Sequence, residues 1–231
     1  MPETGQAEDL MDRMHIYLGN KNYSSWSLRP WLLMRHGGLD FGETVLPLDL
    51  DTPEETRDPR ISEISPSHRV PVLRHGGITI WESLAIMEYL AETFAEKQFW
   101  PHDRERRAHA RAISNEMHAG FGALRHECPC NLRRPVSRLE VSPACRRDVA
   151  RIASIWKECR ETYGSDGPFL FGAFSIADAM YAPVVNRFHI YELSSDPAVQ
   201  AYMETILSLP AYGEWKSAAE QEPWVIRAEE V

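Results

Sequence analysis

The spacing of apolar residues changes about 100 residues into the chain, near Phe99-Trp100-Pro101. Before this point, short apolar runs alternate with helical patterns, and glycine, proline and polar turns separate them. After it, apolar residues recur almost only at the three- or four-residue spacing of helices. Such a chain can fold as an α/β unit followed by an all-α unit. We therefore expect two domains, residues 14–97 and 102–231, of sizes typical of single domains.

The first unit has the order strand, helix, strand, then strand, strand, helix. We expect its elements at residues 15–19, 27–36, 44–48, 70–73, 78–80 and 82–95, with a glycine turn at His75-Gly76-Gly77 inside the last strand pair. Its βαβ part is too short for a dinucleotide-binding domain and has no Gly-x-Gly-x-x-Gly loop. The order predicts a small mixed sheet with helices packed on it, as in thioredoxin.

The second unit is predicted to be all helical. We expect helices at residues 103–126, 142–163, 175–188, 197–208 and 210–220, separated by proline, glycine and serine. Residues 1–13 are acidic and polar, without the basic and apolar regions of a signal peptide. We expect them to be a disordered lead-in, with Met14 beginning the folded part.

Charge and cysteine usage exclude several classes of function. The net charge of −9 argues against nucleic acid, because binding phosphates requires a concentrated basic surface. No apolar run approaches the ~20 residues of a membrane span. The four cysteines all follow residue 127, and the spacing of Cys128 and Cys130 matches neither a zinc site nor a redox pair. We expect reduced thiols, no metal and a cytoplasmic protein.

Three serines precede or open the first helix in Asn22-Tyr-Ser-Ser-Trp-Ser-Leu-Arg-Pro-Trp31. A hydroxyl just ahead of a helix N-terminus can donate to an anion, and the helix end adds partial positive charge. The other interpretation is that these serines only turn and cap the helix, and for Ser27 we favour it.

Two further motifs stand at element starts, and a third lies in the helical unit. Val70-Pro71 opens a strand, and Glu82-Ser83, in Trp81-Glu-Ser-Leu-Ala-Ile86, opens the helix after the hairpin. Hydroxyl and N–H groups at a helix start suit a carboxylate, although each motif alone is also explained by ordinary strand opening or capping. Ser175 with Asp178 is a capping-box pair, to which we assign folding and no chemistry.

These motifs, in this order over nearly the whole chain from Met14, resemble the cytosolic glutathione S-transferases, in particular the serine-type zeta-like and bacterial ones. The resemblance implies that Ser24 is the catalytic serine holding the glutathione sulfur as a thiolate, with Ser25 its neighbour. It implies a cis Val70-Pro71 bond, with the Val70 backbone paired to the cysteinyl part of glutathione. Glu82 and Ser83 would bind the γ-glutamyl end.

The resemblance also suggests further contacts. His68 and Arg69 precede the strand where the family binds the glycyl carboxylate, and a solvated loop is the equal alternative. The remaining candidates line the electrophile pocket on the family pattern: Trp26, His118, Phe121, Arg125 and Arg187. His118 is a weak candidate for a general base, because a lone histidine is more often satisfied by ordinary hydrogen bonds. Arg187 is a weak candidate for contacting a substrate carboxylate, because its offset from Pro183 differs from the zeta pattern.

The expected function is transfer of glutathione to a small electrophile in detoxification, with glutathione as co-substrate, no metal and a homodimer as the assembly. A glutathione-dependent cis–trans isomerase is the alternative, although Trp26 stands where zeta enzymes carry cysteine and would reshape the pocket. No cysteine lies in residues 14–97, which argues against a mixed-disulfide mechanism. A non-catalytic interaction module of the same fold is the third reading, because fold alone does not fix function.

Overall fold

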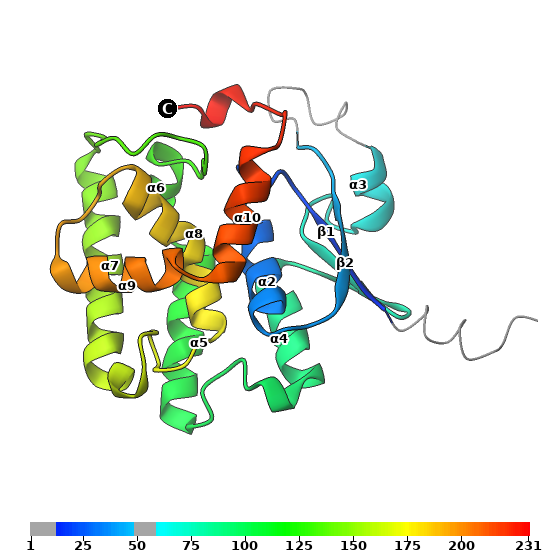
Figure 1. Ribbon diagram of the computed structural model, residues 1–231, viewed down its shortest axis with the longest axis horizontal. Coiled ribbons are helices and arrows are strands. Elements are labelled where there is room, and N and C mark those ends of the chain that lie inside the picture. Colours follow the sequence, from blue (N-terminus) through cyan, green and yellow to red (C-terminus); the bar gives the residue numbers. More distant parts are fainter. Residues whose placement is uncertain (1–12, 49–58) are drawn as a thin grey trace, which may run out of the picture.

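The computed structural model describes residues 13–48 and 59–231. Apart from Arg13, the predicted lead-in lies outside the described residues. The chain forms an α/β unit and a helical unit that lie side by side, with the sheet on the right and the helical unit on the left of Figure 1.

Within residues 13–48 and 59–231 the sheet has four strands, in the order β2-β1-β3-β4. The strands are β1 (Met14–Leu18), β2 (Phe41–Val45), β3 (Val72–His75) and β4 (Ile78–Trp81). β1 runs parallel to β2 and antiparallel to β3, and β3 runs antiparallel to β4. This is the mixed sheet expected from the sequence. β2 begins three residues earlier than predicted, because its pairing with β1 extends back to Phe41 opposite Met14.

Among the described residues of the first unit, three α-helices accompany the sheet: α2 (Ser25–His36), α3 (Pro59–Ile64) and α4 (Ser83–Thr93). α2 begins two residues before the predicted Ser27, because Ser24 acts as its cap and accepts a hydrogen bond from the Ser27 N–H. α3 was not predicted. It lies in a proline- and acid-rich stretch, and Ile61 is its one buried residue.

Six α-helices form the second unit. They are α5 (Arg104–Ala119), α6 (Gly122–Glu127), α7 (Pro143–Tyr163), α8 (Ile176–Ile190), α9 (Pro197–Leu207) and α10 (Pro210–Glu220); short 3₁₀ turns η2 (Ala95–Lys97), η3 (Gly164–Asp166) and η4 (Arg227–Glu229) add to the chain. The prediction of one helix over 103–126 was wrong. Phe121 adopts a left-handed φ of 61°, which breaks the helix between α5 and α6 and buries the ring.

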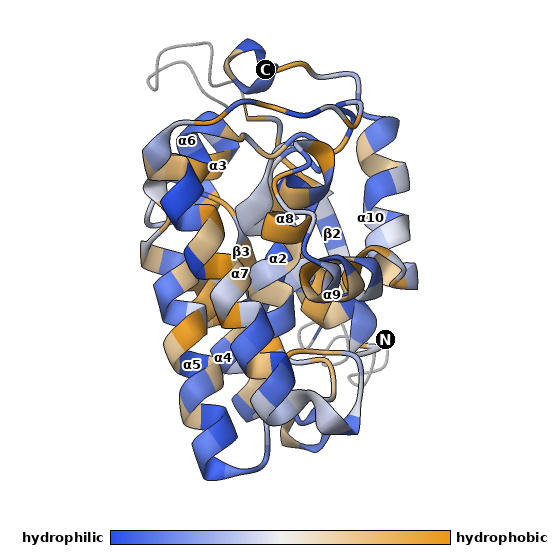
Figure 2. Cartoon of the chain, turned by 90° about the vertical axis from the view of Figure 1, so that its left-hand side faces the viewer, coloured by the Kyte–Doolittle hydropathy of each residue, from blue (hydrophilic) through white to orange (hydrophobic). Residues whose placement is uncertain are grey.

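α8 is the buried centre of the molecule. It packs against α2, α5 and α9, and its start carries the predicted capping box of Ser175 and Asp178. Figure 2 shows hydrophobic residues along α8 in the interior and hydrophilic bands on α5 and α10. Because α8 supports α2 from behind, it places the start of α2 at the junction of the two units. None of the described helices combines the length and apolar character needed to cross a membrane.

Candidate functional site

A cavity of about 340 Å³ lies at the junction between the sheet unit and α5. Residues from four separate stretches of the chain line it: Trp26, Ser67, Arg69, Val70, Pro71, Glu82, Ser83 and His118. Seven of these eight are candidates from the sequence, and Ser67 is the one that sequence reasoning missed. The fold therefore gathers the three N-terminal motifs around one space.

The Val70-Pro71 peptide bond is cis, as the resemblance implied. Within the described ranges, neither the N–H nor the C=O of Val70 is bonded to another main-chain group. Both residues line the cavity. An extended ligand segment can therefore add to this edge through backbone hydrogen bonds.

Glu82 and Ser83 form a polar corner at the start of α4. Glu82 precedes the helix with φ 69° and ψ 126°, a conformation that non-glycine residues seldom adopt outside functional sites. Ser83 is 1% exposed, and its Oγ has no hydrogen-bond partner among the described residues. A buried unpaired hydroxyl beside the positive end of a helix is suited to accept a carboxylate as its partner.

The serines of the first helix are partly engaged with one another. Ser24 Oγ donates to Ser27 Oγ at 2.8 Å and accepts from the Ser27 N–H at 3.3 Å. Ser27 Oγ also accepts from the Gly19 N–H at 3.0 Å. Ser25 is the first residue of α2 and is buried. Neither Ser24 nor Ser25 is among the residues that line the cavity, whereas Trp26 is.

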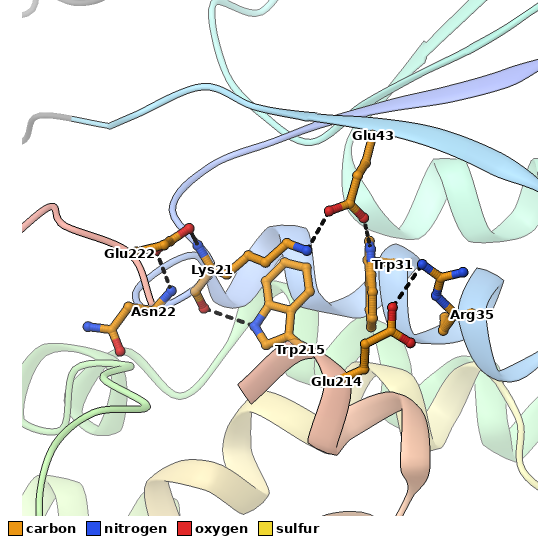
Figure 3. Close-up of polar contacts among 8 residues, drawn as sticks. All are labelled: Lys21, Asn22, Trp31, Arg35, Glu43, Glu214, Trp215 and Glu222. Atoms are coloured by element: carbon orange, nitrogen blue, oxygen red, sulfur yellow. Dashed lines mark hydrogen bonds and ion pairs between the residues drawn. The ribbon is translucent and has the colours of Figure 1, made fainter. Parts of the chain in front are cut away.

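The loop ahead of Ser24 is held from the C-terminal part of the chain. The Glu222 carboxylate accepts the backbone N–H groups of Lys21 at 2.7 Å and Asn22 at 3.1 Å. Trp215 Nε1 donates to the Lys21 carbonyl at 2.9 Å, as Figure 3 shows. Asn22 is also bonded through its side chain to Asn131. Contacts more than 100 residues away in sequence therefore set the path of this loop.

The Lys21 side chain is buried between two indole rings. Its Nζ lies 5.0 Å from the Trp31 ring and 5.1 Å from the Trp215 ring, and it forms an ion pair of 2.5 Å with Glu43. Glu43 also accepts the indole N–H of Trp31 (Figure 3). Burial opposes ionisation of Glu43, but the hydrogen bonds from Lys21 and Trp31 outweigh it and lower its pKa. This ion pair joins the loop to β2 and α2.

The two loop residues before Val70 point in different directions. Arg69 lines the cavity, and its N–H donates to Ser65 Oγ. His68 is exposed, and its Nδ1 is paired with Ser62 Oγ at 2.9 Å. Of the two candidates for the glycyl carboxylate, the structure brings only Arg69 to the cavity. Ser67, on the same loop, joins it there.

The candidates on α5 and beyond separate into two groups. His118 lines the cavity and lies 4.0 Å from Glu82 Oε2. Burial, and then the charge of Arg29, lower the pKa of His118 against the opposing effect of Glu82. Phe121 is buried and away from the cavity.

The arginine candidates lie behind the cavity wall. Arg125 stacks on the Trp26 ring at 4.7 Å, and Arg187 is 5% exposed and donates to the Cys128 carbonyl. Arg29, which sequence reasoning missed, stacks on the same ring at 4.4 Å. Its sequence signal was a charge placed between the apolar residues Leu28 and Trp31.

Over residues 13–48 and 59–231, no group of three or more His, Cys, Asp or Glu side chains is placed to hold a metal ion. The four cysteines are free and buried.

Two family models match the chain. The model described as "Glutathione S-transferase, N-terminal domain" matches residues 23–93, and that of the "Glutathione S-transferase, C-terminal domain" matches residues 140–205. The first match includes the serines ahead of and within α2 (Ser24, Ser25 and Ser27), the Val70-Pro71 bond and the Glu82-Ser83 pair.

Individual proteins agree with these models. A probable maleylacetoacetate isomerase of Caenorhabditis elegans is 29% identical over 211 residues, 85% of this chain and 90% of the relative. Glutathione S-transferase L3 of Arabidopsis thaliana is 26% identical, covering 81% of this chain and 76% of the relative. The crystal structure of a glutathione transferase homolog from Burkholderia, with bound glutathione, superposes with a TM-score of 0.68 at 24% identity, over 91% of this chain and 100% of the other.

Proposed function

The chain belongs to the glutathione S-transferase family, and we propose that it binds glutathione in the cavity at the junction and activates its thiol for attack on a small electrophile. One observation carries this proposal. Ser83 and Val70 line the same cavity, and among residues 13–48 and 59–231 the Ser83 hydroxyl has no hydrogen-bond partner and the Val70 backbone has no main-chain partner. A γ-glutamyl carboxylate and a cysteinyl backbone are the groups that complete them.

The proposed position of glutathione follows from these groups. The γ-glutamyl carboxylate meets the Ser83 hydroxyl and the N-terminus of α4, and Glu82 offsets the ammonium group. The cysteinyl N–H and C=O pair with Val70. Arg69, the arginine among the residues that line the cavity, binds the glycyl carboxylate. In this orientation the thiol lies toward the start of α2, where Trp26 lines the cavity and Ser24 and Ser25 directly precede it in the chain.

Thiol activation requires stabilisation of an anion. A free thiol has a pKa of ~8.5, so only ~3% is thiolate at pH 7. Lowering this pKa by ~2 units requires ~2.7 kcal/mol. One charge-assisted hydrogen bond contributes ~1.5–3 kcal/mol and a helix end ~0.3–1 kcal/mol, so one serine at the start of α2 is sufficient.

We assign that serine as Ser24, the residue at the cap. Its hydroxyl proton points at Ser27 Oγ, but hydroxyl hydrogens rotate, and Ser27 can donate to Ser24 in return. In that arrangement the Gly19 N–H donates to Ser27 Oγ, Ser27 Oγ donates to Ser24 Oγ, and the Ser24 hydroxyl proton is available to the sulfur. Chains of this kind strengthen each hydrogen bond in them.

The test combines binding with turnover. We expect the full chain to be retained on immobilised glutathione, to bind glutathione by calorimetry, and to conjugate 1-chloro-2,4-dinitrobenzene in an absorbance assay. Binding without turnover of any electrophile class would favour the non-catalytic module. Absence of binding would contradict the proposal outright.

Isomerisation is the second candidate. The relatives named as maleylacetoacetate isomerases favour it, whereas Trp26 stands where the zeta pattern has cysteine. In isomerisation the thiolate adds to a double bond and later leaves, so glutathione is regenerated. Chromatography of a maleyl substrate after reaction separates the two: an unchanged glutathione concentration with a new geometric isomer favours isomerisation, and a conjugate favours transfer.

We also propose that the protein works as a cytoplasmic homodimer in detoxification. The family pattern is the basis for the dimer; on the edge strand β4, Ile78 and Trp81 are 51% and 40% exposed. The four free buried cysteines are typical of a reducing compartment. Sedimentation equilibrium of the full chain tests the dimer: a mass near 26.5 kDa would contradict it.

A further inference from the structure

Residues 222–231 follow α10, and we call them the C-terminal strap. Two of its side chains bind the loop that leads to Ser24. The Glu222 carboxylate accepts two consecutive backbone N–H groups of this loop, as Figure 3 shows. Near the other end of the strap, Glu230 Oε1 accepts the Tyr23 hydroxyl at 2.5 Å. The strap is therefore bonded to the loop at both of its ends.

Arg133, in the segment between α6 and α7, joins the strap to Tyr23. Its Nη2 donates to the Tyr23 hydroxyl at 2.9 Å and to the Trp224 carbonyl at 2.6 Å, and its Nη1 donates to the Glu222 carbonyl at 2.6 Å. The guanidinium carbon lies 5.6 Å from the centre of the Tyr23 ring. A guanidinium group presents several N–H donors in a fixed plane, so it can hold these acceptors in one arrangement. A single side chain thus binds both the strap and Tyr23.

The segment around Arg133 also binds Asn22. Asn22 Nδ2 donates to Asn131 Oδ1 at 2.9 Å, and Asn22 Oδ1 accepts the Arg133 N–H at 2.9 Å. The Leu132 N–H donates to the Asn22 carbonyl at 3.2 Å. Asn22 and Asn131 are 0% and 1% exposed, so these hydrogen bonds are shielded from water. A buried network whose members are bonded to one another fixes a single conformation, and the residue two positions ahead of Ser24 belongs to it.

Tyr23 is bonded to the same stretch of backbone that places Ser24. The N–H groups of Tyr23 and Ser24 both donate to the Asn20 carbonyl, at 3.2 and 2.8 Å. The Tyr23 carbonyl accepts the Ser25 N–H at 2.9 Å. These hydrogen bonds form one tight turn, so a displacement of Tyr23 also displaces Ser24. A misplacement of ~1 Å at a reacting group can lower turnover ~100-fold.

We propose that Arg133 is a positioning residue for thiol activation, which holds Tyr23 and the C-terminal strap so that the Ser24 hydroxyl meets the glutathione sulfur. This inference rests on the proposed function. Arg133 acts through the loop that leads to Ser24, because its side chain is occupied by the Tyr23 hydroxyl and two strap carbonyls. Coupling between binding equilibria is reciprocal, so a docked strap that lowers the thiol pKa is itself stabilised by bound thiolate.

Two variants test the positioning role. Arg133→Met removes the guanidinium and keeps an unbranched side chain, and Tyr23→Phe removes only the hydroxyl that joins Arg133 to Glu230. In both variants the thiol pKa of bound glutathione should rise by at least ~0.5 unit, so that kcat at neutral pH falls at least ~3-fold. The loss should disappear at alkaline pH, with little change in the KM for glutathione, and Arg133→Lys should recover part of it. Thiolate absorbance against pH and steady-state kinetics measure these quantities.

Arg134→Met is the matched control. Arg134 also lies against a tyrosine ring, that of Tyr191 at 4.3 Å, and its Nε donates to the Val231 carbonyl of the strap at 2.9 Å. Among the described residues, its side chain has no hydrogen bond to the loop that leads to Ser24. The control should keep the thiol pKa of the parent. An unshifted thiol pKa in both test variants would overturn the proposal, and so would an equal shift in Arg134→Met, because the effect would then not be specific to Arg133.

Amide hydrogen exchange distinguishes failure of this inference from failure of the proposed function, because it can be measured without glutathione. The amides of residues 21–25 should exchange at least tenfold faster in Arg133→Met and Tyr23→Phe than in the parent and Arg134→Met. If they do, but calorimetry detects no glutathione binding to the parent, the transfer function fails and the hold of Arg133 on the loop stands. If glutathione binds and these amides exchange equally in all four proteins, Arg133 does not position the loop and the inference alone fails.

Discussion

The carboxylate of Glu222 accepts the backbone N–H of Lys21 at 2.7 Å, three residues ahead of Ser24. Its second oxygen accepts the next N–H, that of Asn22. A single side chain near the C-terminus therefore fixes two consecutive amide groups of the loop that leads to Ser24. The position of Ser24 depends on this contact as well as on α2.

Replacing Glu222 with alanine is expected to lower the free energy of unfolding by about 1–3 kcal/mol, because two charge-assisted hydrogen bonds are lost and two N–H groups are left without their partner. Turnover should also fall, since the loop before Ser24 is released. Urea denaturation and the conjugation assay measure the two effects. Glu220→Ala is the control, because Glu220 is exposed and its ion pair with Lys216 is long, at 4.0 Å. Similar behaviour of the two variants would mean that the Glu222 contact does not position the loop.

Asp178 gives a prediction about pH. Burial raises the pKa of this carboxyl to about 6, against hydrogen bonds from Leu170 and Ser175 that favour the ionised form. The folded state then binds a proton more readily than the unfolded chain, whose value is near 3.8. The contribution of Asp178 to stability is therefore full below pH 4 and is lost as pH rises to about 6, by about 3 kcal/mol.

The measurement is urea denaturation of the parent and of Asp178→Asn between pH 4 and pH 8. The difference in unfolding free energy, parent minus variant, should fall from pH 4 to about pH 6 and then stay level. Asparagine does not titrate, so contributions from other groups cancel in this difference. A difference that rises over the same range would show that the hydrogen bonds outweigh burial and that the Asp178 pKa is lowered.

Most of the fold could be predicted from the sequence because the signals for its helices, strands and turns each lie within a few consecutive residues. The strand-turn-strand around His75-Gly76-Gly77 and the capping box of Ser175 and Asp178 are each written within a few residues, and both appear in the structure. The break at Phe121 was missed, because the helical spacing of apolar residues continues across it; the signal in the sequence was the pair of glycines, Gly120 and Gly122, that flank it.

The candidate site was less predictable where it depends on distant contacts. Val70 and Ser83 stand in recognisable motifs, and both line the cavity. Glu222 binds the backbone of Asn22, in the loop that leads to Ser24, from 200 residues away in sequence, and no local pattern indicates this contact. Arg29 looked like part of an ordinary helix until the structure brought two other arginines beside it. Which side chains converge is a property of packing rather than of spacing.

Ser83→Ala should weaken glutathione binding about tenfold with little change in stability. The hydroxyl has no partner among the described residues, so removing it breaks no hydrogen bond of the folded chain, whereas a bound carboxylate would lose one charge-assisted bond. Calorimetry measures the glutathione affinity, and thermal unfolding measures the stability. Ser114→Ala is the matched control: its hydroxyl is also buried and unpartnered, but it does not line the cavity. Equal affinities in the two variants would remove Ser83 from the binding site.

The last prediction decides which serine activates the thiol. Ser24→Ala should raise the pKa of bound glutathione by ~1–2 units through loss of one charge-assisted bond. Turnover at neutral pH should fall ~10–100-fold and recover in part at alkaline pH, where the thiolate forms unaided. Because Ser24 also caps α2, this variant should lose ~0.5–2 kcal/mol of stability. Ser25→Ala, which leaves the cap intact, should have a milder effect on each quantity.

Thiolate absorbance in the ultraviolet, followed against pH, separates the possibilities for both variants. Ser27→Ala belongs in the same series, because Ser27 is the partner of Ser24 at 2.8 Å and holds it in place without reaching the sulfur. It should therefore shift the thiol pKa in the same direction as Ser24→Ala, but by less. An unshifted titration in Ser24→Ala with a raised pKa in Ser25→Ala would move the assignment by one residue. Unshifted titrations in all three would remove serine from the mechanism and leave the end of α2 and the main-chain donors as the activators, because the neighbouring Tyr23 hydroxyl is already bonded to Glu230 and Arg133.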